Sequence, residues 1–357
     1  TKNRLAVVQP GVINKKLQDM LKEENFFWGP DPSSQDYSTV GGNIANNSAG
    51  PRAIKYGTPR DNILGLEFVS GTGEIYKTGV RTSKGVVGLD LTRLFTGSEG
   101  VLGILTEATL KILPLNNSIK TIEVTFDDIS SASKTIINLM TQPVTPYKLE
   151  FVDKQSISLI NTIKTNHYEK DTNSAILLEI DGESEYIDIM LSKIITVIEK
   201  SKFKKLTIAE NQIDINNLWS ARKSLSPALR ELGGYKINED IAVPISNLTD
   251  LLEKLEKISI KYNIKIVNFG HAGNGNIHVN LLFNTEEEKK SENSIKCLEE
   301  IFDLVLSLDG TLSGEHGIGV IKKQYLNKEI DKNTLTLMKK IKKQFDPKNI
   351  LNPNKSI

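Results

Sequence analysis

The chain of 357 residues has little of three features that would assign it at once to a class of protein. It has a single cysteine, Cys297, which excludes an internal disulfide and agrees with a reducing compartment. No uninterrupted apolar run approaches the roughly 20 residues that a bilayer requires, so we expect no membrane-spanning segment. Charge of one sign is not in excess either: 45 basic and 44 acidic side chains give a net charge of +1. This balance argues against nucleic acid or an acidic membrane surface as the partner and favours a small-molecule ligand.

The composition is that of an ordinary globular protein, with 38% apolar and 25% charged residues. The length favours two domains with cores large enough to enclose a cofactor. Cys297 lies in the helical pattern from Ile295 to Leu306, where a buried structural thiol is the simplest interpretation. The strand-like run from Leu5 to Val8 follows directly on the N-terminus, so we expect further sequence upstream of Thr1. We expect a cytoplasmic location, and peripheral association with the inner face of the membrane is the open alternative.

The first part of the chain predicts a mixed α and β domain over residues 1–115. Hydrophobic periodicity predicts a helix from Asn14 to Glu24, and alternating β-branched runs predict three strands. The strands are expected at Leu64 to Ser70, Glu74 to Thr78 and Ala108 to Leu113, with runs of small residues at Thr39 to Gly50 and Gly97 to Gly103.

The pattern changes at about Asn116, where strands begin to alternate with charged amphipathic helices. This predicts a second domain over 116–330, an antiparallel sheet with helices on one face, so the expected fold class is α+β. The expected strands include Thr121 to Phe126 and Ala175 to Ile180, the helices Asp127 to Met140 and Glu185 to Ser201, and a last basic helix Lys332 to Phe345 within 331–357.

Three of the four histidines lie inside two glycine-rich loops of the second domain. The glycines between His271 and His278 break a helix, so we expect a loop that carries His271 and a strand that carries His278. On that strand Asn280 shares the face of His278, because side chains alternate with period two. The fourth histidine, His167, lies in a charged stretch and is expected at the surface.

The second loop, Gly314 to Gly319, adds Glu315 and His316. Two neutral imidazoles and one carboxylate form a three-ligand set that leaves coordination positions open, as catalytic metal sites do. We therefore expect His271, His278 and Glu315 to bind a divalent metal, Zn, Mn or Fe, and His316 to remain as a base. The competing interpretation is that these histidines only fix the core and the loops.

A predicted helix from Trp219 to Ser226 places Arg222 and Ser226 on one face, since they are four residues apart. An arginine beside a hydroxyl can hold a carboxylate in a fixed orientation. A solvated helix face is the alternative interpretation, and Lys236 carries the same ambiguity.

Small residues from Thr39 to Gly50 offer several backbone N–H groups with little side-chain bulk, as a bound phosphate or cofactor edge requires. Their spacing matches neither a dinucleotide fingerprint nor a P-loop. Together with other segments this run resembles the FAD-binding oxidoreductases of the vanillyl-alcohol oxidase (PCMH) type, within them the D-lactate dehydrogenase, glycolate oxidase large subunit and D-2-hydroxyglutarate dehydrogenase group. The segments that carry the resemblance are Thr39 to Ala45, Tyr56 to Gly65, Leu94 to Glu107, His271 to Asn280, Gly314 to Gly319 and Phe345 to Pro353.

The resemblance implies a PCMH-type FAD-binding domain, of which 1–115 is the C-terminal portion, and a cap domain that holds the metal. It implies that 331–357 returns to the FAD domain, with Asn352 at the flavin. It also implies that Arg222, Ser226, Lys236 and Asn280 contact the substrate. The residues that it places around FAD are Pro32, Thr39, Gly41, Gly42, Ala45, Ser48, Gly50, Glu99, Gly103, Ile104 and Asn352.

The implied reaction is oxidation of a small D-2-hydroxy acid, namely D-lactate, glycolate or D-2-hydroxyglutarate. The metal would lower the pKa of the substrate hydroxyl, His316 would take the proton, and the Cα hydrogen would leave as hydride to FAD. The electron acceptor stays open between a quinone, an electron-transfer flavoprotein and an iron-sulfur subunit, and a homodimer is an open alternative for the assembly.

Two departures from the family pattern accompany the resemblance. The phosphate-binding stretch of the Arg-Gly-Gly-Gly-Thr-Gly type is expected upstream of Thr1, and Asn274 stands where the family usually has aspartate, which removes a charge near the metal. Two other functions compete with this one. A metal-dependent hydrolase would use the same ligands to activate water, but would leave the glycine-rich loops of the first domain without a purpose. A non-catalytic remnant or subunit of a flavoprotein complex would bind or assemble without turnover.

Overall fold

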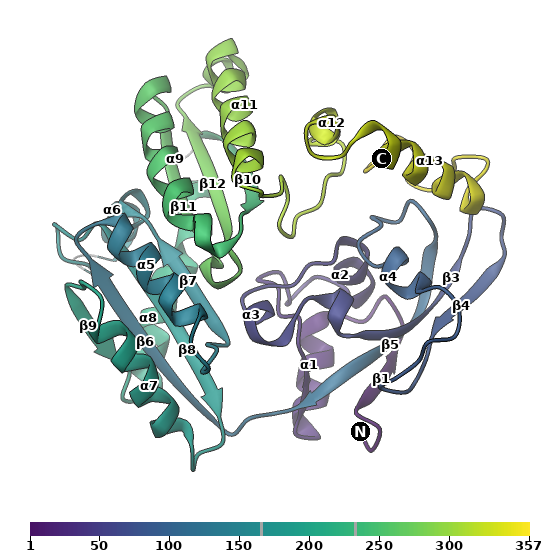
Figure 1. Ribbon diagram of the computed structural model, residues 1–357, viewed down its shortest axis with the longest axis horizontal. Coiled ribbons are helices and arrows are strands. Elements are labelled where there is room, and N and C mark those ends of the chain that lie inside the picture. Colours follow the sequence, from purple (N-terminus) through teal and green to yellow (C-terminus); the bar gives the residue numbers. More distant parts are fainter. Residues whose placement is uncertain (165–166, 232–233) are drawn as a thin grey trace. The chain divides into compact units, whose positions relative to one another are not determined.

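The computed structural model describes residues 1–164, 167–231 and 234–357. The chain divides into two compact units, which are described separately (Figure 1). Unit 1 comprises Thr1–Leu115 and Glu315–Ile357, and unit 2 is the continuous segment Asn116–Gly314. Within the described ranges, no helix has both the length and the apolar content needed to cross a bilayer.

Unit 1 is built on a five-stranded antiparallel sheet in the order β1-β5-β3-β4, with β2 paired to β5. The strands are β1 (Leu5–Val8), β2 (Phe26–Trp28), β3 (Ile63–Val69), β4 (Ile75–Gly79) and β5 (Ile104–Pro114). The helices are α1 (Asn14–Glu23), α2 (Val40–Asn46), α3 (Ala53–Tyr56), α4 (Leu91–Phe95), α12 (Leu326–Glu329) and α13 (Lys332–Phe345), with short 3₁₀ turns at Pro59–Asp61 and Lys323–Tyr325.

One face of this sheet is apolar and buried, because alternate residues of β3 and β5 such as Phe68 and Leu110 point into the core of unit 1. Helix α13 belongs to this core. Its Phe345 ring stands edge-on to Phe95 at 5.0 Å between centroids, and the Phe345 carbonyl accepts a hydrogen bond of 2.8 Å from Gly71 N–H. Asp331 caps the helix at its N-terminus, because its carboxylate accepts from two backbone N–H groups of the first turn. The last helix is thus fixed to unit 1 by packing and by its cap.

Unit 2 contains a seven-stranded sheet in the order β10-β12-β11-β7-β8-β6-β9, antiparallel throughout. The strands are β6 (Ser118–Phe126), β7 (Lys148–Val152), β8 (Ser174–Gly182), β9 (Lys205–Ile208), β10 (Tyr235–Ala242), β11 (Lys265–Gly270) and β12 (Asn276–Phe283). The helices are α5 (Ile129–Met140), α6 (Lys154–Ile163), α7 (Ile187–Glu199), α8 (Gln212–Glu231), α9 (Leu248–Tyr262), α10 (Glu286–Lys290) and α11 (Glu292–Ser307), with 3₁₀ turns η2 (Ile245–Asn247) and η3 (Ala272–Asn274).

Both faces of this sheet are covered. Helices α6 and α8 pack on one face, where Leu225 of α8 meets Val152, Val267 and Phe269 of the strands. Residues of the opposite parity, such as Phe151, are also fully buried, which places the remaining long helices over the other face. We call the face that α6 and α8 cover the α8 face. The α+β class is confirmed, and the structure adds this second helical layer to the one that the sequence predicts.

The predicted helices and strands are present, with ends that differ by a few residues. The structure adds one detail and corrects one expectation. The small-residue run that starts at Thr39 begins as a short helix, α2, because the Thr39 side chain accepts a hydrogen bond from Gly42 N–H and caps it. His167 is not a surface residue: its side chain is only 17% exposed and its ring stands against Tyr168 at 4.6 Å. Cys297 is buried, as expected.

Candidate active site

The residues of unit 2 that are predicted to bind the metal or the substrate lie mainly on its α8 face. In the β10–β12 register Asp240 is paired with His278, Asn238 with Asn280 and Lys236 with Leu282. Directly paired residues of antiparallel strands point to the same face, so Lys236, His278 and Asn280 lie on one surface. The next pairing, Phe269 with His278, shows that this surface is the one that α8 covers.

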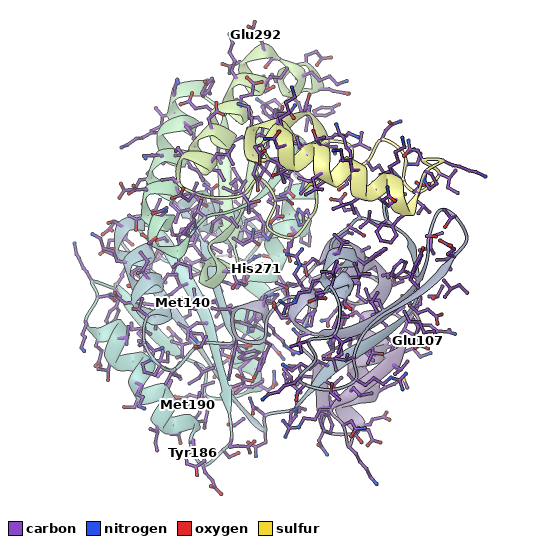
Figure 2. All side chains as sticks on the ribbon, turned by 45° about the vertical axis from the view of Figure 1, so that its right-hand side comes forward. Glu107, Met140, Tyr186, Met190, His271 and Glu292 are labelled. Atoms are coloured by element: carbon purple, nitrogen blue, oxygen red, sulfur yellow. The ribbon has the colours of Figure 1, made fainter. Side chains whose placement is uncertain are left out.

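His271 follows the end of β11, where the chain enters the 3₁₀ turn η3 (Figure 2). Its Nδ1 atom is 2.5 Å from Oε1 of Glu150 on β7. Its ring lies 5.3 Å from the ring of His278 in an edge-to-face arrangement. The two imidazoles that the sequence predicts as ligands are therefore neighbours, and a carboxylate fixes the first of them.

Glu150 joins this histidine to Arg222 of α8. Its second oxygen, Oε2, accepts from Arg222 Nε at 2.9 Å and from Nη2 at 2.7 Å. Burial alone would raise the pKa of Glu150, but the charges of His271 and Arg222 outweigh it and hold the pKa at about 2. The guanidinium also lies over the Phe269 ring, 4.5 Å from its centre. Arg222 is thus engaged in a buried ion pair and is not a residue of a solvated helix face.

A second carboxylate stands beside His278. Oδ1 of Asp240 is 3.7 Å from His278 Nδ1, and Asp240 is completely buried. Asn276 Nδ2 donates to the same Oδ1 at 2.7 Å and to the Ile241 carbonyl at 2.8 Å. Each candidate imidazole ligand therefore has a buried carboxylate near its Nδ1 atom, at hydrogen-bond distance for His271 and at ion-pair distance for His278. The His271 contact is the kind that orients metal-binding histidines.

The chain returns to Asp240 just before the second glycine-rich loop. Gly314 N–H donates to the Asp240 carbonyl at 3.2 Å. A Cβ atom on Gly314 would come within 2.3 Å of Asn276 Nδ2, so a side chain here would displace the amide that holds Asp240. Glu315 is the next residue along the chain.

The predicted substrate contacts of unit 2 have different surroundings. Asn280 is 1% exposed; its Oδ1 accepts from Asn238 at 2.7 Å and its Nδ2 donates to the Val267 carbonyl at 3.2 Å. Ser226 is exposed on α8, one helical turn beyond Arg222. The inward-facing amide of Asn280 is thus occupied by the sheet itself.

In unit 1 the predicted metal ligand Glu315 is fixed by the segment that leads from α2 to α3. Its Oε2 accepts from Gly50 N–H at 3.0 Å, and its carbonyl accepts from the Ser48 hydroxyl at 3.2 Å. Gly50 has a φ of +84°, and a Cβ there would lie 2.4 Å from the Asp31 carbonyl oxygen, so no other residue fits. His316, next in the chain, is exposed.

The residues predicted to surround FAD all lie in unit 1. Thr39 and Gly42 form the start of α2, and Gly41 packs so tightly that a Cβ would lie 2.5 Å from that of Pro10. Ile104 is 61% exposed at the start of β5. Of the others, Pro32 and Gly103 are buried, Ala45 and Ser48 are half-buried, and Glu99 and Asn352 form hydrogen bonds with each other and with the chain.

Sequence reasoning missed Glu150 and Asp240. Glu150 had a signal, because a carboxylate inside the apolar strand from Lys148 to Val152 needs a buried partner. Asp240 lies four residues after Lys236 on β10, where no residue pattern marks it as a neighbour of His278. Neither partner could be read from sequence spacing, since Glu150 is 121 residues from His271.

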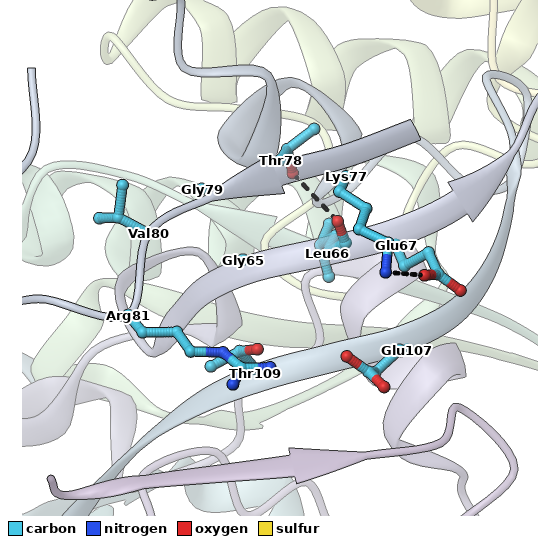
Figure 3. A pocket seen from close by; sticks show the side chains of 10 residues that line it. All are labelled: Gly65, Leu66, Glu67, Lys77, Thr78, Gly79, Val80, Arg81, Glu107 and Thr109. Carbon is cyan, nitrogen blue, oxygen red and sulfur yellow. Dashed lines mark hydrogen bonds and ion pairs between the residues drawn. The ribbon is translucent and has the colours of Figure 1, made fainter. Parts of the chain in front are cut away.

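Two cavities lie away from these residues. One, of about 230 Å³, is on the outer face of the unit 1 sheet between β3, β4 and β5, where Lys77 pairs with Glu67 at 2.9 Å (Figure 3). The other, of about 980 Å³, is lined by Tyr235, Lys265 and Phe283, at the ends of strands β10, β11 and β12 remote from His278. None of the predicted site residues lines either of these two cavities.

Comparison with known proteins defines the class. The C-terminal domain model of the FAD linked oxidases matches residues 115–356, and a FAD binding domain model matches residues 1–79. The chain is 37% identical to glycolate oxidase subunit GlcD of Bacillus subtilis over 99% of its own length and 75% of the relative. It is 30% identical to the D-lactate dehydrogenase of Anaerostipes hadrus over 99% of the chain and 76% of the relative.

Solved structures show the same fold at low identity. The chain superposes on p-cresol methylhydroxylase with a TM-score of 0.77 at 16% identity, covering 99% of the chain and 76% of that protein. It superposes on alkyldihydroxyacetonephosphate synthase with a TM-score of 0.72 at 18% identity, covering 99% of the chain and 64% of that protein. The chain is therefore a FAD-linked oxidoreductase with a PCMH-type fold. It belongs to the FAD linked oxidase family and is related to glycolate oxidase subunits and D-lactate dehydrogenases.

Proposed function

We propose that the chain is the catalytic part of a FAD-dependent, metal-assisted dehydrogenase that converts a small D-2-hydroxy acid to the 2-oxo acid. The observation that carries the proposal is the pair of neighbouring imidazoles on the α8 face, His271 and His278, each with a buried carboxylate near its Nδ1 atom. Family membership supports the flavin, and it removes the ground for the hydrolase alternative. D-lactate, glycolate and D-2-hydroxyglutarate are the candidate substrates.

The donor set fits a divalent metal. A histidine whose Nδ1 proton is held by a carboxylate presents Nε2 as a basic ligand, and Glu150 is placed to do this for His271. Glu315 adds the carboxylate, held through Gly50 N–H. These ligands suit Zn, Mn or Fe and leave coordination positions for substrate oxygens.

The support for FAD in unit 1 is the match of residues 1–79 to a FAD binding domain. Gly41 and Gly50 shape this segment, because a Cβ there would lie 2.5 Å from Pro10 Cβ and 2.4 Å from the Asp31 carbonyl oxygen. We propose that Pro32, Thr39, Gly41, Gly42, Ala45, Ser48, Gly50, Glu99, Gly103, Ile104 and Asn352 form this side of the cofactor site.

When bound, the metal would supply a Lewis acid for the substrate hydroxyl and FAD would supply the hydride acceptor. This chain's own residues supply the rest. Arg222 uses two of its N–H groups on Glu150 and turns others to the substrate carboxylate, with Ser226 and Lys236 completing that contact. Asn280, whose amide is bonded to Asn238 and to the Val267 carbonyl, orients the strands beneath this contact. His316 Nε2 or Nδ1 takes the hydroxyl proton as a general base. A quinone, an electron-transfer flavoprotein or an iron-sulfur subunit then takes the electrons.

The test is the visible spectrum of the purified protein with FAD, before and after anaerobic addition of D-lactate, glycolate or D-2-hydroxyglutarate. We expect the flavin bands to bleach with one of these acids, and L-lactate serves as the control for configuration. His316→Ala and metal chelation should each stop the bleaching, whereas His167→Ala, whose imidazole lies beside Tyr168, should retain it. Retained flavin that no hydroxy acid reduces would refute the proposed substrate class, and loss of all flavin would favour a non-catalytic subunit.

A further inference from the structure

Glu99 stands at a point where three segments of unit 1 meet. Its backbone N–H donates to the Ala45 carbonyl of α2 at 2.8 Å. Its own carbonyl accepts from Asn352 Nδ2 of the C-terminal tail at 2.5 Å. Its carboxylate points to the glycine-rich loop, where Oε1 accepts from Ile318 N–H and Oε2 from Gly319 N–H, both at 2.7 Å.

The backbone of Glu99 is also unusual. Its φ is +51°, in the left-handed region that residues with a side chain rarely adopt. Such a conformation persists only where the surroundings fix it, and it is concentrated at functional sites. Here the surroundings are the four hydrogen bonds to α2, the loop and the tail.

The loop is shaped to receive this carboxylate. Two consecutive N–H groups, those of Ile318 and Gly319, converge on one anion, the geometry of a backbone nest. Gly317 has a φ of +82°, and a Cβ there would lie 3.0 Å from Glu99 Oε1. The Glu99 carboxylate therefore occupies space that is open only because residue 317 is glycine.

We infer that Glu99 is a positioning residue for the loop that carries Glu315 and His316. The inference rests on the proposed function for the roles of these two residues, but the contact itself does not. Ile318 follows His316 by two residues, so anchoring its N–H fixes the direction in which the loop leaves the imidazole. Hydrogen bonds from Gly50 and Ser48 hold the loop at Glu315, and the Glu99 carboxylate holds its other end. In this assignment the Glu99 side chain holds the loop, in addition to the place of this residue in the proposed cofactor site.

The matched substitution is Glu99→Gln, which keeps the size of the side chain. A glutamine offers one acceptor and turns an N–H₂ donor toward the second backbone N–H, so at least one of the two bonds is lost. The control is Glu107→Gln, on β5 of the same unit, whose carboxylate faces the cavity in Figure 3. Glu99→Asp keeps the charge on a shorter stem and gives an intermediate case if the glutamine variant folds poorly.

The first readout is amide hydrogen exchange by mass spectrometry on the peptide over residues 315–322. We expect Glu99→Gln to accelerate exchange there about tenfold or more, the factor for one lost hydrogen bond to a charged group, and to leave the peptide over β5 unchanged. Glu107→Gln should change neither. Unchanged exchange over 315–322 in Glu99→Gln would overturn the inference, whatever the protein catalyses.

The second readout separates positioning from stability. If the wild type reduces its flavin with a hydroxy acid, Glu99→Gln should lower kcat about tenfold or more with a smaller change in KM, since His316 is misplaced for proton removal. It should also lower the affinity for Co²⁺, followed by its visible absorption. A faster-exchanging loop with unchanged kcat and Co²⁺ affinity would refute the positioning role, whereas a wild type that no hydroxy acid reduces would refute the proposed function alone.

Discussion

Replacing Glu150 by glutamine removes the negative charge between Arg222 and His271 and leaves the shape almost unchanged. The carboxylate is 2% exposed, and both of its oxygens are engaged. Without it the Arg222 guanidinium becomes a buried cation with no counter-charge at this position. Removing one partner of a buried ion pair costs about 3–5 kcal/mol of unfolding free energy. In a unit of this size that loss lowers Tm by about 6–20 °C.

The substitution should also weaken metal binding. A glutamine no longer holds the Nδ1 proton of His271 with a negative charge. Loss of a carboxylate that orients a metal-binding histidine lowers metal affinity about 10–100-fold. Calorimetric unfolding measures the first effect, and titration with Co²⁺ followed by visible absorption measures the second.

Glu179→Gln is the matched control for the loss of stability. Glu179 lies on the same α8 face and is 3% exposed, with Lys148 Nζ at 3.1 Å. Its replacement leaves the half-buried Lys148 cation without this carboxylate, so Tm should fall, but Glu179 does not contact His271 and the affinity for Co²⁺ should stay unchanged. The reasoning would be refuted if Glu150→Gln and Glu179→Gln weakened Co²⁺ binding equally. It would also fail if Glu150→Gln and Arg222→Met had additive effects on unfolding, because two residues of one ion pair must show coupling.

Three further substitutions have defined outcomes. Gly317→Ala forces a side chain onto a φ of +82° and should cost about 1–2 kcal/mol by thermal unfolding, while Gly11→Ala, which meets nothing within 4 Å, should be near neutral. Burial raises the pKa of Asp153 to about 6, above its unfolded value of about 4, so the folded state binds the proton more tightly. The stabilisation from this group is present below pH 4 and is lost as pH rises to about 6, so the free energy of unfolding should fall by about 3 kcal/mol relative to that of Asp153→Asn. Denaturant unfolding at a series of pH values measures this difference. Parallel pH profiles for the two proteins would contradict the prediction. Asn276→Ala removes hydrogen bonds of 2.7 and 2.8 Å, one of them to Asp240, and should cost about 2–3 kcal/mol in the same assay; a cost below 0.5 kcal/mol would refute the role of this amide.

Much of the fold follows from local patterns. The helix from Lys332 to Phe345 has the predicted bounds, because a capping aspartate precedes it and Asp346-Pro347 ends it. The His271 loop and the strand with His278 also appear as the glycine pattern predicts. The second helical layer over the sheet was not predictable, since burial of both faces depends on which helices cross the sheet and period-two alternation does not say what covers each face.

The candidate site is likewise predictable from the sequence only in part. Residue type and glycine context predict His271, His278 and Glu315, whereas the carboxylates beside the two imidazoles depend on strand order. Glu150 reaches His271 only because β7 pairs with β11, and no sequence separation encodes that pairing. The Glu99 contact with Ile318 spans 219 residues and has no sequence signal beyond the glycines around it.

The continuity of unit 2 has a consequence for how such proteins diversify and can be engineered. Unit 2 is one continuous segment, Asn116–Gly314, that the chain connects to unit 1 at its two ends. A single recombination cassette with these bounds therefore transfers all of the following residues together: Arg222, Lys236, His271, His278 and Asn280. Their mutual register travels with the strands that hold it. Glu315, His316 and the small-residue loops stay with the recipient, so a chimera exchanges the side chains proposed to contact the substrate, while it keeps the proposed flavin site and the proposed base of its host.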